Sequence, residues 1–280
     1  MSCCEVPIEN NYLIMSKYTN FDNESKKKPL KLCNFLNTRK KLDDDGCEIT
    51  KMIPPYSITS PYNKILDFNN KTKAVCGNTD LSMFLDQCKV IFVGDANCGK
   101  TSLINRFTSS TFDSEYKPTA GVEYETKYFD VLDIGYSVGL WDVPGDERFK
   151  MIVQSYYKNA NVIVVVFDLT RPSTLASAMN WMRETLAANL KTDPIRFLVG
   201  TKSDLLSKKA LEGLEAHANF VAQELDAEFF SVSSKNASEI NNLFKRFTAL
   251  AFENSVQKLI RPPDYYTVKN NLTSKFFVGK

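Results

Sequence analysis

The residues best suited to chemistry stand together between Gly94 and Thr101, where the sequence reads GDANCGKT. This stretch matches the pattern G-x-x-x-x-G-K-[ST], whose glycines let successive backbone N–H groups point at one phosphate. The helix expected to follow adds the positive end of its dipole, because Leu103, Ile104 and Phe107 recur at helical spacing. The stretch therefore predicts a phosphate loop. Its expected nucleotide contacts are Asn97, Cys98, Gly99, Lys100, Thr101 and Ser102.

Within this loop, Lys100 is expected to reach the β- and γ-phosphates, and the Thr101 hydroxyl is expected to bind Mg²⁺. Two further oxygen ligands are available for the metal. Asp142 ends a strand beside the loop, and Thr119 lies in the segment YKPTAG. A hydroxyl at Thr119 would join the metal shell only while the γ-phosphate is present, as in a switch loop. Gly145, just after the strand, offers a backbone N–H to the same phosphate.

A second cluster of polar residues is suited to reading a purine base. Asp204, in the segment TKSD, can accept two hydrogen bonds from the N1–H and amino group of guanine, whereas adenine presents no such pair of donors. The stem of Lys202 would cover the base plane, and Phe112 would pack at its edge. The segment Ser233, Ser234 and Lys235 would offer a backbone N–H to the guanine oxygen. The pattern predicts selection of GTP and GDP over ATP.

These residues follow strands of a predicted α/β fold. Expected strands occupy Val90 to Val93, Val122 to Val131, Tyr136 to Asp142, Val162 to Phe167, Ile195 to Val199 and Glu228 to Val232. Between them, apolar residues recur at helical spacing over Leu175–Leu186 and Ile240–Leu250. Alternating strands and helices predict a six-stranded, mostly parallel sheet with helices on both faces. Ligands of such sheets bind beyond the carboxyl ends of the strands, so we expect the site in the loops after residues 93, 142, 199 and 232.

Composition excludes several other classes of protein. The 280 residues carry 35 Lys and Arg against 33 Asp and Glu, so no charge excess points to a nucleic-acid partner. The longest apolar run, Val162 to Phe167, is far shorter than the ~20 residues of a membrane-spanning helix. Seven cysteines without a CxxC pair, together with a single histidine, argue against a disulfide framework or a zinc site. A cytoplasmic setting fits this cysteine usage.

The chain divides into three parts by composition. Residues 1–87 contain scattered prolines, short charge clusters and few apolar residues, so we expect an extension that is largely disordered. Residues 88–256 form the predicted α/β domain, and residues 257–280 form a tail. Acylation of Cys3 and Cys4, or contact of the basic clusters with anionic lipid, is the alternative to a solvated extension.

Taken together, the motifs resemble those of the Ras-like small GTPases, and among them the Rab family. The resemblance covers about residues 88–256. It rests on GDANCGKT at 94–101, Thr119 in YKPTAGVEY, WDVPGDERF at 141–149, TKSD at 201–204 and SSK at 233–235. It implies a GTPase domain that binds GTP, GDP and Mg²⁺ and regulates vesicle traffic. The long extension and the sequence ALAFEN at 249–254 resemble a Golgi-associated Rab subgroup linked to lysosome positioning and cilium formation.

The resemblance also implies partners. Tyr124, Trp141 and Tyr156 would form an aromatic surface for effector proteins, and a nucleotide exchange factor and a GTPase-activating protein would act on the switch. A location in the cytoplasm, peripheral to Golgi or other internal membranes, follows from the same likeness. No cysteine follows Cys98, however, so we expect no prenylation at the C-terminus of this chain.

Two departures from the family pattern concern the chemistry. Asp146 stands where the family has a glutamine that orients the attacking water. An ionised carboxylate only accepts hydrogen bonds, whereas an amide also donates them, so we expect slow GTP hydrolysis. Lys100, Thr119, Gly145 and Asp146 are the expected catalytic set. Thr201 replaces the asparagine of the base-reading motif, and we expect it to hold the phosphate and base loops together less well while guanine preference survives.

Three functions stay open on these residues. The first is a GTP-dependent switch that recruits effectors to membranes, and the second is a GTP-binding scaffold that hardly hydrolyses nucleotide. The third is a kinase of a small metabolite, which would need an arginine-rich lid that the sequence does not offer.

Overall fold

The computed structural model describes residues 47–51, 59–79 and 81–261. The chain separates into two units, of which Gly46–Val256 is the larger. The other unit joins Met1–Asp45 to Gln257–Lys280, and the structure describes it only at residues 257–261, the end of the last helix and the residue after it. The disorder predicted for most of the N-terminal extension therefore concerns residues outside the described part of the chain.

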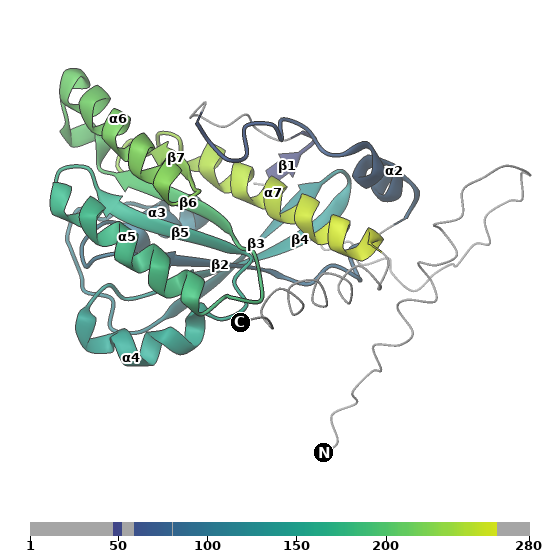
Figure 1. Cartoon of the computed structure of the whole chain (residues 1–280), viewed down its shortest axis with the longest axis horizontal. Coiled ribbons are helices and arrows are strands. Elements are labelled where there is room, and N and C mark those ends of the chain that lie inside the picture. The colour runs from purple at the N-terminus through teal and green to yellow at the C-terminus, as the bar shows by residue number, and fades with distance from the viewer. Residues whose placement is uncertain (1–46, 52–58, 80, 262–280) are drawn as a thin grey trace, which may run out of the picture. The chain divides into compact units, whose positions relative to one another are not determined.

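A seven-stranded sheet runs through the described residues in the order β1-β3-β4-β2-β5-β6-β7 (Figure 1). Its strands are β1 (Cys47–Ile49), β2 (Cys88–Val93), β3 (Glu123–Val131), β4 (Ile134–Asp142), β5 (Val162–Asp168), β6 (Ile195–Thr201) and β7 (Glu228–Ser231). Only β3 and β4 pair antiparallel, and the other neighbouring pairs are parallel. The six strands expected from the sequence are present, which confirms the mostly parallel α/β sheet, and β1 adds one strand from the extension.

Helices cover both faces of this sheet. They are α2 (Asn70–Asn78), α3 (Lys100–Ser109), α4 (Lys150–Val153), α5 (Pro172–Ala187), α6 (Lys208–Glu224) and α7 (Ile240–Ile260). Among the described residues, none of them combines the length and the apolar character that crossing a bilayer requires.

The alternation of side chains along β2 explains how the two faces are filled. Ile91 and Val93 belong to a buried cluster with residues of α5 and α6. Phe92 points the other way and packs on Phe244 and Phe247 of α7, with ring centroids 5.9 and 6.4 Å apart. Central strands of a parallel sheet are buried on both faces and therefore read as continuous apolar runs. All seven residues of β5 are buried accordingly.

Part of the extension packs on this domain as a strap, defined here as residues 59–79. Arg246 of α7 is fully buried, and its guanidinium donates to the carbonyl oxygens of Ile65 (2.7 Å) and Tyr62 (2.8 Å). Its Nε lies 3.2 Å from Glu228 at the start of β7, and Glu228 also accepts a bond from the Ser60 hydroxyl at 2.8 Å. The strap thus closes over a buried ion pair of the domain.

Candidate functional site

The phosphate loop leaves the carboxyl end of β2 and leads into α3, as the sequence predicts. Gly94 has φ +146°, and a Cβ atom placed on it would lie 2.1 Å from the carbonyl oxygen of Val166. Gly99 caps α3 with φ +90° and offers no side chain to the first N–H groups of the helix. The amino end of α3 is therefore open to an anion from the loop side.

Lys100 lies within this loop and is only 5% exposed. Its ammonium group donates to the carbonyl oxygens of Gly94 (2.9 Å) and Asp95 (3.0 Å). Its third contact is the Cys98 thiol at 3.9 Å, a weak acceptor that a phosphate oxygen would replace. Burial raises the pKa of that thiol, so Cys98 stays protonated and serves the loop through its backbone. Asn97 is exposed and Ser102 is half-buried in the first turn of α3.

The three expected metal ligands meet at the start of α3. The hydroxyl oxygens of Thr101 and Thr119 lie 3.0 Å apart, and the Thr101 hydroxyl donates to Oδ2 of Asp142. Asp142 is 3% exposed, and its Oδ1 has no hydrogen-bond partner. Burial raises the pKa of Asp142 to about 6, against the lowering effects of the Thr101 bond and of Lys100. A hard divalent cation prefers such oxygen ligands and would satisfy the orphaned carboxylate oxygen, so this donor set fits Mg²⁺.

Gly145 lies directly against the phosphate loop. A Cβ atom placed on it would lie 2.3 Å from the carbonyl oxygen of Gly94 and 2.6 Å from the backbone nitrogen of Ala96. No side chain fits there, because backbone atoms cannot move aside as a flexible side chain can. The backbone of Gly145 is therefore placed where a phosphate bound by the loop would meet it.

Asp146 follows immediately but binds another residue. Arg148 donates to Oδ2 of Asp146 from Nη2 (2.6 Å) and Nε (2.9 Å), and its backbone nitrogen donates to Oδ1 at 2.9 Å. The hydrogen bonds from Arg148 hold the pKa of Asp146 below its usual value, so this carboxylate is ionised at neutral pH. A paired, ionised acid at this position has no proton to donate.

Two of the base-reading residues, Thr201 and Lys202, contact the phosphate loop. The Thr201 hydroxyl lies within hydrogen-bond distance of two carbonyl oxygens, those of Cys98 (2.6 Å) and Phe167 (3.1 Å). Lys202 donates to the carbonyl oxygen of Asn97 at 2.9 Å. Asp204 lies in the 3-10 helix Ser203–Leu205 and accepts a hydrogen bond from the Ser233 hydroxyl. The second base-reading loop, Ser233 to Lys235, therefore lies beside Asp204.

Arg106 of α3 joins that second loop to the rest of the site. It donates to the carbonyl oxygens of Ser234 (2.6 Å) and Lys235 (3.2 Å). Its guanidinium also lies over the ring of Phe112, 5.8 Å from the centroid. Phe112 is 38% exposed, so its ring is accessible beside the loop.

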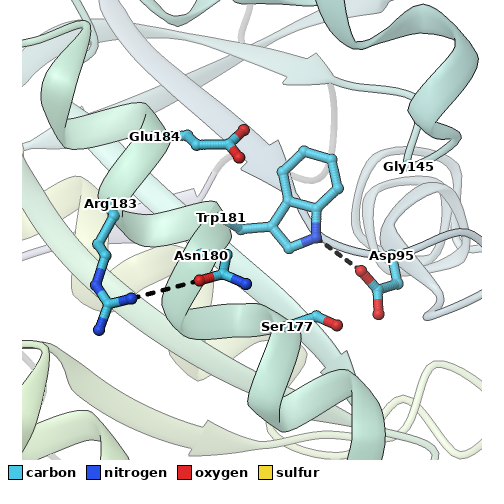
Figure 2. A pocket seen from close by; sticks show the side chains of 7 residues that line it. All are labelled: Asp95, Gly145, Ser177, Asn180, Trp181, Arg183 and Glu184. Carbon is cyan, nitrogen blue, oxygen red and sulfur yellow. Dashed lines mark hydrogen bonds between the residues drawn. The ribbon is translucent and has the colours of Figure 1, made fainter.

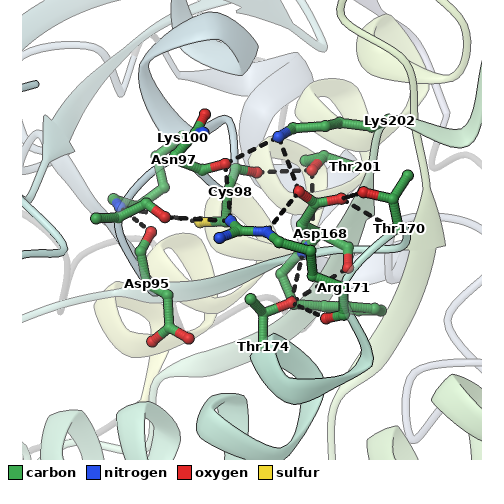
Figure 3. Close-up of polar contacts among 12 residues, drawn as sticks. Asp95, Asn97, Cys98, Lys100, Asp168, Thr170, Arg171, Thr174, Thr201 and Lys202 are labelled. Carbon is green, nitrogen blue, oxygen red and sulfur yellow. Dashed lines mark hydrogen bonds and ion pairs between the residues drawn. The ribbon is translucent and has the colours of Figure 1, made fainter. Parts of the chain in front are cut away.

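Sequence reasoning missed several residues of the site. The loop after β5 was not among the four expected to carry chemistry, although β5 also ends at the carboxyl edge of the sheet. From this loop, Arg171 donates to carbonyl oxygens of the phosphate loop, and Asp168 at the end of β5 pairs with Arg171 (Figure 3). The available signal was the run DLTR directly after the apolar strand.

A second missed contact comes from α5. The indole nitrogen of Trp181 donates to Oδ1 of Asp95 at 2.8 Å (Figure 2). The contact borders a cavity of about 320 Å³. Its lining residues are Asp95, Gly145, Ser177, Asn180, Trp181, Arg183 and Glu184. Helical spacing in the sequence indicates only that Trp181 is near the core, because its polar edge is not visible in the pattern.

The aromatic residues expected on the surface lie side by side. The ring centroid of Trp141 is 4.7 Å from that of Tyr124 and 5.7 Å from that of Tyr156. Tyr124 is 45% exposed and Tyr156 is 37% exposed, and Lys89 lies over the Trp141 ring at 4.9 Å. Three strand and helix segments thus contribute to one accessible aromatic cluster.

Comparison with known proteins agrees with this geometry. Residues 89–253 match the model of the Ras family. Human Ras-related protein Rab-36 is 43% identical over 190 residues, which cover 68% of this chain and 71% of that protein. Ras-related protein Rab-34 from Rattus norvegicus is 44% identical over 168 residues, or 60% of this chain and 65% of the relative. With these matches and this fold, the chain belongs to the Ras family of small GTPases and, within it, to the Rab proteins.

Proposed function

We propose that this chain is a switch that binds GTP or GDP together with Mg²⁺, recruits effector proteins in its GTP form and hydrolyses GTP slowly. As a Rab-type small GTPase it acts in the regulation of membrane traffic. The observation that carries the proposal is the meeting of Thr101, Thr119 and Asp142. Thr119 and Asp142 are 18 and 41 residues from Thr101 in sequence, yet their oxygen atoms converge at the mouth of the phosphate loop.

The residues around the phosphate loop have different roles in this proposal. Thr101, Thr119 and Asp142 would hold Mg²⁺, which neutralises charge on the β- and γ-phosphates when it is bound. Lys100 contributes a buried positive charge, and Gly145 contributes a backbone N–H. Thr119 belongs to a segment without helix or strand, Ser110–Val122, so its position depends on such ligands more than on backbone pairing. Loss of the γ-phosphate would release this segment, which is the switching step.

The base is selected by Asp204 in this proposal. Its carboxylate matches the two adjacent donors of guanine, and a bond to Ser233 holds it beside the loop whose backbone would meet the guanine oxygen. Arg106 holds that loop through Ser234, so the donor and acceptor groups for one edge of a purine are supported from α3.

Slow hydrolysis follows from Asp146. In the reaction, a water oxygen bonds to the γ-phosphorus, the bond to the β–γ bridging oxygen breaks, and GDP and phosphate are released. A residue that orients this water must accept from it and donate toward the phosphate, as an amide does. Asp146 cannot donate a hydrogen bond, and its carboxylate is already occupied by its pair with Arg148.

The same pair supports a second candidate, a scaffold that binds GTP and hardly turns it over. In either case the aromatic cluster of Tyr124, Trp141 and Tyr156 would be the effector surface. An exchange factor and a GTPase-activating protein would act on the switch segments. Attachment at the surface of Golgi or other internal membranes completes the proposal.

Nucleotide displacement tests base selection. The full chain is loaded with a fluorescent GDP, and unlabelled GTP or ATP is added. We expect GTP to displace the probe at a concentration far below that needed of ATP, and Asp204→Ala to abolish the difference, while Asp226→Ala, a surface control, leaves it intact. Equal displacement by GTP and ATP in the unmodified chain would contradict guanine selection.

Multiple-turnover release of phosphate then separates the two candidates. The switch predicts slow, linear phosphate production that depends on Mg²⁺. If GTP stays unhydrolysed for a period many times longer than the lifetime of its complex with the chain, the chain is instead the scaffold.

A further inference from the structure

Arg171 lies where β5 turns into α5 and reaches across to the phosphate loop. It is the residue before Pro172, the first residue of α5. Its Nη2 atom donates to the carbonyl oxygens of Ala96 (3.2 Å) and Asn97 (3.0 Å). These contacts span 75 and 74 residues of sequence, and they touch only the backbone of the loop. The cation therefore acts on the shape of the loop and does not depend on the loop's side chains.

The position of Arg171 is fixed by a buried carboxylate. Asp168, 1% exposed at the end of β5, accepts from Arg171 Nε at 2.9 Å and from Lys202 Nζ at 2.8 Å (Figure 3). Its other oxygen accepts from the backbone nitrogen (2.9 Å) and hydroxyl (2.6 Å) of Thr170. Burial alone would raise the pKa of Asp168, but the bonds from Lys202 and Thr170 outweigh it and lower the pKa. Asp168 is therefore ionised and orients both cations.

Both cations then converge on the same peptide of the phosphate loop. The carbonyl oxygen of Asn97 accepts from Arg171 Nη2 (3.0 Å) and from Lys202 Nζ (2.9 Å). In a planar trans peptide, the C=O of one residue and the N–H of the next point in opposite directions. Holding the carbonyl groups of Ala96 and Asn97 toward Arg171 therefore turns the N–H groups of Asn97 and Cys98 to the other side of the loop.

That other side is the expected phosphate site. The Cys98 N–H points at the carbonyl oxygen of Asp95 (3.4 Å), which also accepts from the Lys100 ammonium at 3.0 Å. The backbone donor and the buried cation thus face the same place, where a phosphate oxygen would accept from both. Trp181 holds the side chain of Asp95 from α5, so the loop is supported at three successive residues.

From these contacts we infer that Arg171 is a positioning residue for the nucleotide phosphates, which aims the N–H groups of Asn97 and Cys98 by holding the preceding carbonyl groups outward. The inference rests on the proposed nucleotide binding. The inference also bears on Thr201, which replaces the asparagine of the base-reading motif. The single proton of the Thr201 hydroxyl can serve only one of its two carbonyl acceptors fully at a time, and Arg171 supplies further links from β5 to the loop.

The test compares nucleotide release and phosphate dependence in the full chain. Arg171→Ala is measured beside the unmodified chain and beside Arg196→Ala. Arg196 has two ion pairs, to Asp193 and Asp226, and lies at the amino end of β6, away from the loop. Release of a fluorescent GDP is followed after addition of excess GTP, and competition by GDP and by GMP is measured separately. Arg171→Gln, which keeps a long polar side chain, serves as the second variant if the alanine variant does not fold.

We expect Arg171→Ala to release GDP about five- to tenfold faster, since two partly exposed charged hydrogen bonds are lost. Because the loop amides contact the α- and β-phosphates, GDP should lose affinity several-fold more than GMP does. Arg196→Ala should release GDP at the rate of the unmodified chain.

Two results overturn the inference while leaving nucleotide binding intact. One is an Arg171 variant that releases GDP at the rate of the unmodified chain. The other is an equal loss of GDP and GMP affinity, which would mark a general loss of structure. An unmodified chain that binds no fluorescent GDP would instead refute the proposed function itself.

Discussion

At the scale of single residues, the chemistry depends on which groups are free to donate. Asp146 is ionised and paired with Arg148, whereas Asp142 is buried with one oxygen atom unpartnered. Two aspartates four residues apart thus have opposite surroundings. The buried one, Asp142, is suited to hold a cation. The half-buried one, Asp146, is already paired with Arg148, so it is poorly suited to orient a water molecule.

Replacing Asp146 with glutamine should restore a group that both accepts and donates. We expect Asp146→Gln to accelerate single-turnover GTP hydrolysis about tenfold, because an amide can orient the attacking water. Asp193→Gln, the same change at an exposed ion pair far along the chain, should leave the rate unchanged. An Asp146→Gln variant no faster than the control would contradict the proposal that Asp146 slows hydrolysis.

Gly145 carries a second prediction at this scale. Gly145→Ala places a methyl group 2.3 Å from the Gly94 carbonyl oxygen, so the segment that carries Gly145 must move away from the phosphate loop. We expect GTP affinity to fall more than GDP affinity, since only GTP has the γ-phosphate that this segment would meet. Gly135→Ala is the matched control, because nothing lies within 4 Å of its added Cβ. Equal losses for both nucleotides would refute this role of the Gly145 backbone.

Which residues the sequence could predict depended on whether a local pattern marked them. Thr101 follows the phosphate-loop motif and Asp142 ends a strand, and the structure brings them together with Thr119. Arg171 and Arg106 donate to backbone carbonyl groups of loops distant in sequence, so even where a pattern such as DLTR marks the position of Arg171, it does not identify the partners. Their contacts can be recognised only once the fold has brought the carboxyl ends of the strands together.

At the scale of elements, the strap and α7 depend on one another. α7 presents Arg246 to the carbonyl oxygens of the strap, and it presents Glu253 to Thr72 of α2 at 2.8 Å. Phe68 packs edge-on against Phe252 with centroids 5.9 Å apart. Because Arg246 and Glu228 are both fully buried, each charge depends on the other for compensation.

Removing one partner of this pair should therefore be costly. We expect Arg246→Ala to lower the free energy of unfolding by about 3–5 kcal/mol, because Glu228 is left charged and buried. The double change Arg246→Met with Glu228→Leu should cost less, since no charge remains uncompensated. Denaturant unfolding of the full chain measures both. A double variant as unstable as Arg246→Ala would show that packing, and not charge compensation, dominates.

The elements of the domain were predictable where apolar periodicity was long. β5 and α7 are marked by a continuous apolar run and by repeated helical spacing, and both are present. α2 and β1 were not predicted. β1 has three residues, and α2 buries Thr72 and Cys76 rather than an apolar stripe. Tertiary contacts with Glu253 stabilise α2, and a contact 181 residues away leaves no local pattern.

At the scale of the whole domain, one edge of the sheet gathers the site. β2, β4, β5 and β6 run parallel beside one another, so their carboxyl ends bring the phosphate loop, Asp142, Asp168 and Thr201 to the same edge. The opposite edges of these strands carry the contacts of the strap, such as the bond from the backbone nitrogen of Arg196 to the Tyr62 hydroxyl at 3.0 Å. The expected nucleotide site and these contacts of the strap thus lie at opposite ends of the strands.

The most direct test of the central claim is the nucleotide carried by the purified full-length chain. We predict about one guanine nucleotide per chain, held in Mg²⁺ and released much faster when a chelator removes the metal, because Thr101, Thr119 and Asp142 would then lose the cation that links them to the phosphates. A chain that purifies empty and stays empty in micromolar GTP or GDP with Mg²⁺ would contradict the account.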